Sequence, residues 1–302
     1  MLLPSQLRRP VFAMCPPLSL SAGTPNNVFM REIPESERKI DRAKALRQFV
    51  DIYSFLSSMA IVYLVPSREG LQDMPYVANL GVVIPHFKDD TVIISNFTSL
   101  PRKQEAPLGK AFFELLGYKT IEALGRFEGE ADLKYLGGKT YAGAWGSRTA
   151  SSTLMWLERE TGITIIPIHM TNPLFYHLDC ALFPLSDERV LCATNDLDKD
   201  DVAALEKVTE VVSVSPEMGR QGITNCVRVN RVILCGTQFD AFTPADEEWQ
   251  LERRKVDTLT GYCAKYGYEP VFFNTSEFGK SGAALSCLVM HLNYIEYERN
   301  EE

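Results

Sequence analysis

The sequence predicts an α/β protein in which five small ββαβ units form a closed ring around a central cavity. Five amphipathic stretches are each followed within a few residues by a β-branched or aromatic apolar run that is typical of a strand. Short turns between apolar runs indicate hairpins. No linker rich in Pro, Gly or Ser divides the 302 residues, so we expect a single domain over residues 1–302.

The predicted helices and strands alternate along the whole chain. Helices are expected at about residues 35–58, 108–116, 149–161, 200–208 and 248–266, the last opened by an acidic segment at 244–248. The strands that follow them are expected at residues 60–65, 163–168, 211–214 and 271–273, and in a stretch that ends at residues 126–128. Hairpin turns are expected at residues 88–90, 137–138 and 187–188, before strands at 91–94, 140–142 and 190–192. The repeated order places the polar residues that follow the strands near the centre of the ring.

The composition points to a soluble protein with a small cationic substrate. A net charge of -8 and a pI near 5.2 argue against a nucleic-acid partner, because phosphate binding needs a basic face. No apolar run approaches the roughly 18 residues of a membrane span. The N-terminus lacks the basic-then-apolar order of a secretory signal, because Arg8 and Arg9 interrupt its apolar residues. We therefore expect a cytoplasmic protein that contacts no membrane, and the sequence does not predict its oligomeric state.

The cysteines predict neither disulfides nor a metal site. There are seven of them at irregular spacing and without a Cys-x-x-Cys pair, which is a poor disulfide framework and a poor zinc site. The odd number is typical of a reducing compartment. We expect no metal and no other cofactor.

Cys287 is the candidate nucleophile. Covalent attack on a guanidinium needs a thiolate, a proton shuttle, and carboxylates or amides that hold the planar cation. Cys287 follows a small, flexible segment and precedes an apolar strand, whereas Cys192, Cys235 and Cys263 lie within apolar periodicity and are expected in the core. For an isolated cysteine a buried structural role is the alternative, because free cysteine is among the most buried residue types.

His177 is the best acid/base candidate among the four histidines. A period of two places His177 and Asp179 on the same face of an extended segment, where they could serve as a shuttle and a cation grip. A structural His–Asp pair with no chemical role is equally compatible with this spacing.

Two further polar groups stand near predicted strands. Glu128 and Asp132 flank a glycine just past one strand, and Asp73 and Asn79 stand at the end of another. Each group is a candidate for holding a cation. On composition alone, such clusters are more often acidic turns than sites.

Taken together and in order, these segments resemble the pentein superfamily of guanidine-modifying enzymes, which includes arginine deiminases, dihydrolases, dimethylargininases and amidinotransferases. The resemblance covers nearly the whole chain. It rests on residues 14–17 with 27–30, 73–81, 96–97 with 101–102 and 105, 127–129 with 132, 146 with 148–149, 177–179, and the segment that ends at Cys287. It implies a five-bladed pseudo-symmetric α/β-propeller, in agreement with the five units counted from the pattern.

The resemblance also implies roles for individual residues. Cys287 matches the family's nucleophile, His177 its general acid/base, and Glu128 the glutamate that holds the guanidinium and the histidine. The substrate-binding positions are matched by Asn27, Asp73, Asn79, Arg102, Arg148 and Asp179. Among these, Arg102 and Arg148 are implied to bind the substrate carboxylate by bidentate pairing.

The implied activity is hydrolysis of the guanidine C–N bonds of L-arginine, by a dihydrolase that releases ornithine, carbon dioxide and ammonia or by a deiminase that releases citrulline. The resemblance also allows a dimethylargininase acting on methylated arginine, an amidinotransferase, and a non-catalytic pentein that serves as a binding module. The sequence departs from the family pattern at residues 28–29, 75–76 and 130–131, which we expect to line or adjoin the pocket.

Overall fold

The strands of the computed structural model, which describes residues 2–85 and 90–297, form five separate three-stranded sheets. Their strand orders are β15-β1-β2, β3-β4-β5, β6-β7-β8, β9-β10-β11 and β12-β13-β14. In the last four, an antiparallel hairpin is followed by a third strand that pairs in parallel with the second. In the first, the hairpin partner of β1 is β15 from the far end of the chain, with Phe12 opposite His291.

The strands are short. Their bounds are β1 (Val11–Met14), β2 (Ile61–Leu64), β3 (Gly81–Ile84), β4 (Thr91–Ile94), β5 (Lys119–Glu122), β6 (Leu133–Gly137), β7 (Thr140–Trp145), β8 (Thr164–His169), β9 (Leu182–Pro184), β10 (Arg189–Cys192), β11 (Glu210–Ser213), β12 (Cys226–Val229), β13 (Val232–Thr237), β14 (Glu269–Asn274) and β15 (Met290–His291).

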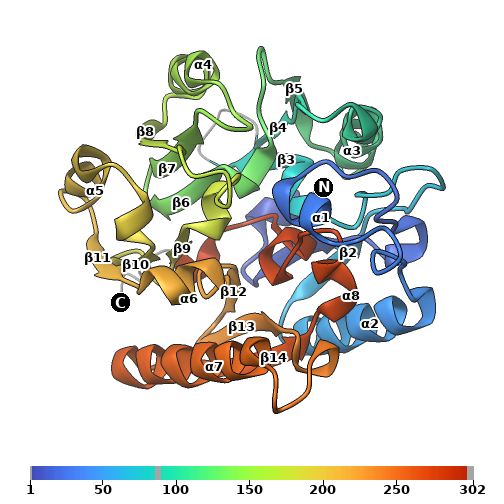
Figure 1. The fold of residues 1–302 in the computed structure, drawn as a ribbon. Helices are drawn as coiled ribbons and strands as arrows, with labels where there is room; N and C mark the ends of the chain where they lie inside the picture. Colours follow the sequence, from blue (N-terminus) through green and yellow to red (C-terminus); the bar gives the residue numbers. More distant parts are fainter. Residues whose placement is uncertain (1, 86–89, 298–302) are drawn as a thin grey trace.

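One main helix lies between the last two strands of each sheet along the chain. These helices are α2 (Arg42–Met59), α3 (Glu105–Leu115), α4 (Ser151–Thr161), α5 (Lys199–Leu205) and α7 (Glu247–Tyr266), and they lie at the periphery with the strands inward (Figure 1). In α2 the buried residues Ala45, Phe49, Ile52 and Leu56 recur at intervals of three and four, so one apolar stripe faces the sheets. Parallel pairing of the flanking strands requires such a crossover.

The predicted units are confirmed, although α3 and α5 depart slightly from their expected bounds, and two predictions are wrong. The first helix begins at Arg42 rather than near residue 35, because Asp41 caps it by accepting the Lys44 N–H at 3.0 Å. The strand predicted to end at 126–128 is instead β5, and Phe127 makes only an isolated antiparallel bridge with Asn96. The turns at 137–138 and 187–188 do connect hairpins, whereas part of the turn at 88–90 lies outside the described residues.

A short 3-10 turn precedes the first strand of the hairpin in most units, and these turns carry the polar residues. They are η3 (Val77–Asn79) before β3, η5 (Gly129–Ala131) before β6, η6 (Leu178–Cys180) before β9 and η9 (Leu285–Leu288) before β15. Turn η3 packs against both η5 and η9. The repeat therefore brings corresponding turns of different units together, although they are far apart in sequence.

Gly129 lies in close contact with the backbone of η3 and of the start of β3. Its φ is +68°, and a Cβ atom there would lie 2.7 Å from the carbonyl oxygens of both Ala78 and Gly81. Because both neighbours are backbone atoms, a side chain could not be accommodated by a rotamer change.

We expect Gly129→Ala to lower the free energy of unfolding by about 1–3 kcal/mol more than Gly138→Ala does. Gly138 is the matched control, because its φ is also positive, at +57°, but open space surrounds its Cβ position. Urea denaturation of both variants measures the difference. Equal losses would show that η5 and η3 are not tightly apposed.

Candidate active site

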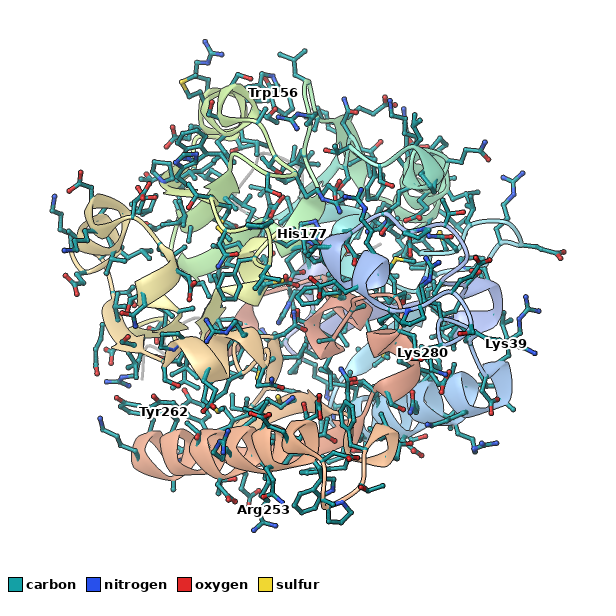
Figure 2. The ribbon with its side chains drawn as sticks, viewed as in Figure 1. Lys39, Trp156, His177, Arg253, Tyr262 and Lys280 are labelled. Atoms are coloured by element: carbon teal, nitrogen blue, oxygen red, sulfur yellow. The ribbon has the colours of Figure 1, made fainter. Side chains whose placement is uncertain are left out.

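The 3-10 turns surround a small cavity in the interior of the molecule, where His177 is labelled in Figure 2. The cavity has a volume of about 20 Å³, room for roughly one water molecule. It is lined by Asn26, Asn27, Asp73, Tyr76, Asn79, Arg102, Arg148, Tyr176, His177, Ser281, Ala283 and Cys287. Seven of the nine predicted site residues are in this set. The other two do not line the cavity, but Glu128 is hydrogen-bonded to His177 and Asp179 to Cys287, which do.

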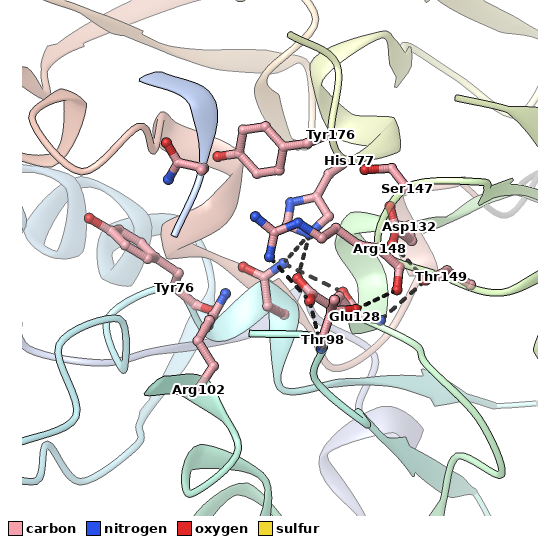
Figure 3. Close-up of polar contacts among 12 residues, drawn as sticks. Tyr76, Thr98, Arg102, Glu128, Asp132, Ser147, Arg148, Thr149, Tyr176 and His177 are labelled. Carbon is pink, nitrogen blue, oxygen red and sulfur yellow. Dashed lines mark hydrogen bonds and ion pairs between the residues drawn. The ribbon is translucent and has the colours of Figure 1, made fainter. Parts of the chain in front are cut away.

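Glu128 is a fully buried carboxylate that holds His177. Its Oε2 lies 2.7 Å from His177 Nε2, while Oε1 accepts the Thr98 N–H at 3.1 Å and lies 3.4 Å from Arg148 Nη1 (Figure 3). Burial opposes the charged form, but His177, Arg148 and Arg102 outweigh it and lower the pKa of Glu128 to about 2. The carboxylate is therefore ionised and fixes the orientation of the imidazole.

Asp132 accepts hydrogen bonds from residues next to Glu128 and His177. Its Oδ2 accepts the Thr149 hydroxyl at 2.6 Å, and its Oδ1 accepts the Leu178 N–H at 3.2 Å. Thr149 Oγ1 in turn accepts the Glu128 N–H at 3.3 Å. Burial raises the pKa of Asp132 to about 6. One carboxylate thus links the backbones next to both His177 and Glu128.

Cys287 lies in η9 and is 6% exposed. Its thiol donates to Asp179 Oδ2 at 3.7 Å, and the same oxygen accepts the Ser286 hydroxyl at 2.6 Å. Burial, followed by the charge of Asp179, raises the pKa of Cys287 to about 12. In this state the sulfur is a protonated thiol, and a cation placed beside it would favour the thiolate. The other cysteines expected in the core, Cys192, Cys235 and Cys263, are fully buried.

The expectation that His177 and Asp179 share one face of an extended segment is wrong. Leu178 to Cys180 form the 3-10 turn η6, so the two side chains diverge. His177 faces the cavity and Glu128, whereas Asp179 contacts Ser286 and Cys287. The alternative of a structural His–Asp pair is equally unsupported, because no hydrogen bond joins the two side chains in the part of the chain that is described.

The two arginines at the cavity are already engaged. Arg102 pairs with Glu105 at 2.7 Å and also donates to the carbonyl oxygens of Asp73 and Tyr76. Arg148 donates to the Asn26 carbonyl at 2.7 Å and lies near Glu128. Binding of a substrate carboxylate by either arginine stays a prediction. Arg148 makes fewer hydrogen bonds to other residues than Arg102 does.

Three asparagine side chains line the same cavity as His177 and Cys287. Asn79 Nδ2 lies 3.5 Å from His177 Nε2 and 3.5 Å from the Glu128 carbonyl oxygen. Asn27 caps α1 (Val28–Glu32), where its Oδ1 accepts the Met30 N–H, and its Nδ2 donates to Ser281 O at 2.8 Å. Asn26 donates to the Asp73 carboxylate. Burial raises the pKa of Asp73, opposed chiefly by Arg102.

Sequence reasoning missed four lining residues, namely Asn26, Tyr176, Ser281 and Ala283, whereas Tyr76 belongs to a segment that was expected to line or adjoin the pocket. These four residues lie within or beside the motifs already singled out, but their residue types carry no chemical signal of their own.

The residues that depart from the family pattern do not all face the cavity. Tyr76 lines the cavity and hydrogen-bonds Ser281, whereas Glu130 turns away from it and accepts the His291 N–H at 2.7 Å.

Within residues 2–85 and 90–297, no group of three or more His, Cys, Asp and Glu side chains is placed to hold a metal ion. The same residues contain no helix that is long and apolar enough to cross a membrane.

Comparison with known sequences finds relatives among arginine-modifying enzymes. No protein-family model matches the chain. The bifunctional arginine dihydrolase/ornithine cyclodeaminase AgrE of Nostoc sp. is 28% identical over 93% of the chain, which spans only 37% of that relative's length. The dimethylarginine dimethylaminohydrolase of Mycobacterium tuberculosis is 27% identical over 59% of the chain and 57% of its own length.

Comparison with solved structures finds the same groups. The product-bound N-terminal domain of ArgZ, an arginine dihydrolase, superposes with a TM-score of 0.81 at 23% identity, covering 94% of this chain and 97% of that one. A dimethylarginine dimethylaminohydrolase superposes with a TM-score of 0.70 at 17% identity, covering 94% and 99%.

The fold is therefore the α/β fold of the penteins, built from five three-stranded units. The chain is a homologue of the arginine dihydrolases AgrE and ArgZ and of dimethylarginine dimethylaminohydrolase.

The thiol environment predicts how Cys287 reacts with iodoacetamide in the absence of substrate. With a pKa of about 12, the thiolate fraction at pH 8 is about one in ten thousand, so alkylation should rise about tenfold per pH unit and reach no plateau below pH 10. Peptide mass spectrometry measures the rate. Asp179→Asn should accelerate alkylation at pH 8 and Ser286→Ala should not; a plateau near pH 8 would contradict the assigned environment.

The bridging role of Asp132 predicts a loss of activity without unfolding. Asp132→Asn keeps the acceptor for Leu178 N–H but replaces the acceptor for the Thr149 hydroxyl with a donor, which loosens Thr149 and the Glu128 backbone. We expect kcat to fall about 10- to 100-fold with little change in KM, by analogy with loss of other orienting groups. Unchanged kcat would show that His177 and Glu128 are held by other contacts.

Proposed function

We propose that this protein is a hydrolase that cleaves guanidine C–N bonds of L-arginine through a covalent amidino-thioether on Cys287. The observation that carries the proposal is the cavity lined by both Cys287 and His177, with His177 held by the ionised Glu128, in a homologue of arginine dihydrolases. The net charge of -8 suits a cationic substrate.

The first step would use the substrate's own charge. A guanidinium bound beside Asp179 would favour the Cys287 thiolate, which His177 helps to form by accepting the proton. The sulfur attacks the guanidinium carbon, the C–N bond breaks, and His177 returns the proton to the departing amine. Asn79 and Glu128 would hold the same planar group, with the Glu128 carboxylate as an acceptor; Asn79 lies 3.5 Å from His177 Nε2.

The second step would release the product. Water takes the place of the departed amine, His177 removes its proton, the oxygen attacks the amidino carbon, and the C–S bond breaks to restore Cys287. One round converts arginine to citrulline and ammonia. A second round would give ornithine, carbon dioxide and a second ammonia. No redox step or electron sink is needed, so we propose a reaction without a metal or cofactor.

We favour the dihydrolase over the other branches. The N-terminal domain of ArgZ is described as an arginine dihydrolase, and it matches this chain over nearly its full length. In the resemblance to the penteins, Asn79 and Asn27 match asparagines that are found in the arginine dihydrolase branch. The match to dimethylarginine dimethylaminohydrolase makes hydrolysis of methylated arginine the second candidate.

We propose that the five units close into a five-bladed α/β-propeller that makes up one domain over residues 1–302. Antiparallel pairing of β1 with β15 supports closure, because it joins the two ends of the chain within one sheet. The unpaired state of all seven cysteines fits a reducing compartment, and we propose a cytoplasmic enzyme. We propose a small-molecule substrate and neither a nucleic-acid nor a membrane partner.

Product analysis tests the proposed reaction. Incubation with L-arginine should yield ornithine and ammonia by mass spectrometry, with citrulline instead if only one round occurs. Nω-methylated arginines should react more slowly than arginine, and added glycine should leave the products unchanged. A glycine-dependent product would make the protein an amidinotransferase, and absence of any product from these substrates would refute the proposed function.

Replacement of the nucleophile tests the covalent route. Cys287→Ser should lower kcat by at least about a thousandfold, because the hydroxyl is a far weaker nucleophile, and should still bind arginine in calorimetry. Cys263→Ala is the control, since that cysteine is buried in α7 and does not line the cavity. Turnover by Cys287→Ser near the wild-type rate would exclude the route.

A further inference from the structure

A hollow just before α2 carries an excess of positive charge, although the whole chain has a net charge of -8. It has a volume of about 290 Å³ and is formed by residues 20–23 and by residues of the segment 35–42. Its charged lining residues are three cations and one acid, namely Arg38, Lys39, Arg42 and Glu35.

This hollow is separate from the cavity at His177. The two spaces share no lining residue. Lys39, which lines the hollow, lies at the edge of the molecule, whereas His177 lies near its centre (Figure 2). The proposed chemistry at Cys287 therefore does not account for the cations of the hollow.

Arg38 has the least satisfied charge of the three cations. Two of its nitrogens, Nε and Nη1, are buried and make no hydrogen bond within residues 2–85 and 90–297. A guanidinium cannot lose its proton in a protein, and a buried charged group without a hydrogen-bond partner is costly. Arg38 lines the hollow, so an anion bound there would supply acceptors, and one guanidinium can pair with two oxygens at once.

Hydrogen bonds to the end of the chain hold the cationic segment in place. The Lys39 carbonyl accepts Lys280 Nζ at 3.0 Å, and the Asp41 N–H donates to Glu277 Oε2 at 2.8 Å. Helix α2 then begins at Arg42. The backbone that carries the cations is thus fixed before a ligand binds, which lowers the entropic cost of binding.

The acidic residues near this segment are engaged elsewhere or lie outside the lining. Asp41 caps α2 by accepting the Lys44 N–H, and Glu277 pairs with Lys280 at 2.8 Å. Neither carboxylate lines the hollow, which leaves Glu35 as its one acidic lining residue. The positive end of the α2 dipole lies at Arg42 and adds to the attraction for an anion.

We propose that this hollow binds a phosphate-class dianion, either free phosphate or the phosphoryl group of a small phosphomonoester. Arg38 would pair with two of its oxygens, and Lys39 and Arg42 would balance its remaining charge. The bound anion would join residues 20–23 to the start of α2. The proposal goes beyond arginine hydrolysis and does not require it.

Calorimetry with inorganic phosphate on the full chain, at pH 8 and constant ionic strength, tests the proposal. Phosphate should bind saturably at one site per chain, and acetate should bind at least about tenfold more weakly because it carries a single charge. Absence of saturable phosphate binding, or equal affinity for acetate, would overturn the proposal. Glycerol 2-phosphate distinguishes the two sources: binding at least as tight as that of phosphate indicates a phosphomonoester, and weaker binding indicates the free ion.

Variants of the lining arginines locate the anion. Arg38→Gln should weaken phosphate binding by at least about tenfold, because it removes the charged, two-pronged donor. Arg42→Gln, at an exposed position, should weaken it at least about threefold and repeats the test should Arg38→Gln fail to fold. Arg159→Gln is the matched control, because it removes the same charge from an exposed residue of α4, and it should change the affinity less than about twofold.

Arg148→Ala distinguishes the hollow from the cavity at Cys287. Arg148 lines only the cavity, so Arg148→Ala should keep phosphate binding within about twofold of the wild-type affinity. Loss of phosphate binding in Arg148→Ala, or unaltered binding in both Arg38→Gln and Arg42→Gln, would overturn the proposal. Phosphate binding is measured without arginine turnover, so failure of the proposed hydrolase would leave these results interpretable.

Discussion

The buried, ionised carboxylate of Glu128 is the interaction on which the rest of the site depends. A carboxylate with no exposed surface is stable only when cations and N–H groups surround it, and here His177, Arg148 and the Thr98 amide do so. Satisfying Glu128 fixes the imidazole of His177, holds Arg148 at the cavity, and joins η5 to the turns beside it. The hydrogen bonds and ion pairs that stabilise the buried Glu128 carboxylate therefore also position His177 for the proposed chemistry.

The fold could be predicted from the sequence because the same local pattern, an amphipathic helix followed by an apolar strand, recurs five times along the chain. Hydrophobic periodicity located the five helices, and the returning strands were found wherever apolar runs were strong. The strand predicted to end at Glu128 was wrong because Phe127 is fully buried among side chains of the core without belonging to a ladder. Pairing with β4, which decides the true position of β5, is not visible in local sequence.

The site could be predicted only in part, and for a physical reason. Ordered motifs identified nine residues, of which seven line one cavity, but they did not show how those residues are bonded. The pairing of Arg102 with Glu105 and the separation of His177 from Asp179 by the turn η6 depend on local backbone conformation. The hydrogen bonds of His177 to Glu128 and of Tyr176 to Gly282 join residues that are far apart in sequence. Such contacts follow from the way the turns converge, which residue types alone do not encode.

Covalent chemistry at Cys287 is the central claim, and intact-protein mass spectrometry of an acid-quenched reaction tests it most directly. During turnover of L-arginine, covalent catalysis predicts a protein species with one additional amidino-containing group. Peptide mapping should place this group on Cys287, and the species should disappear when the substrate is exhausted. Rapid turnover with no covalent species at any time, or with the group on another residue, would contradict it.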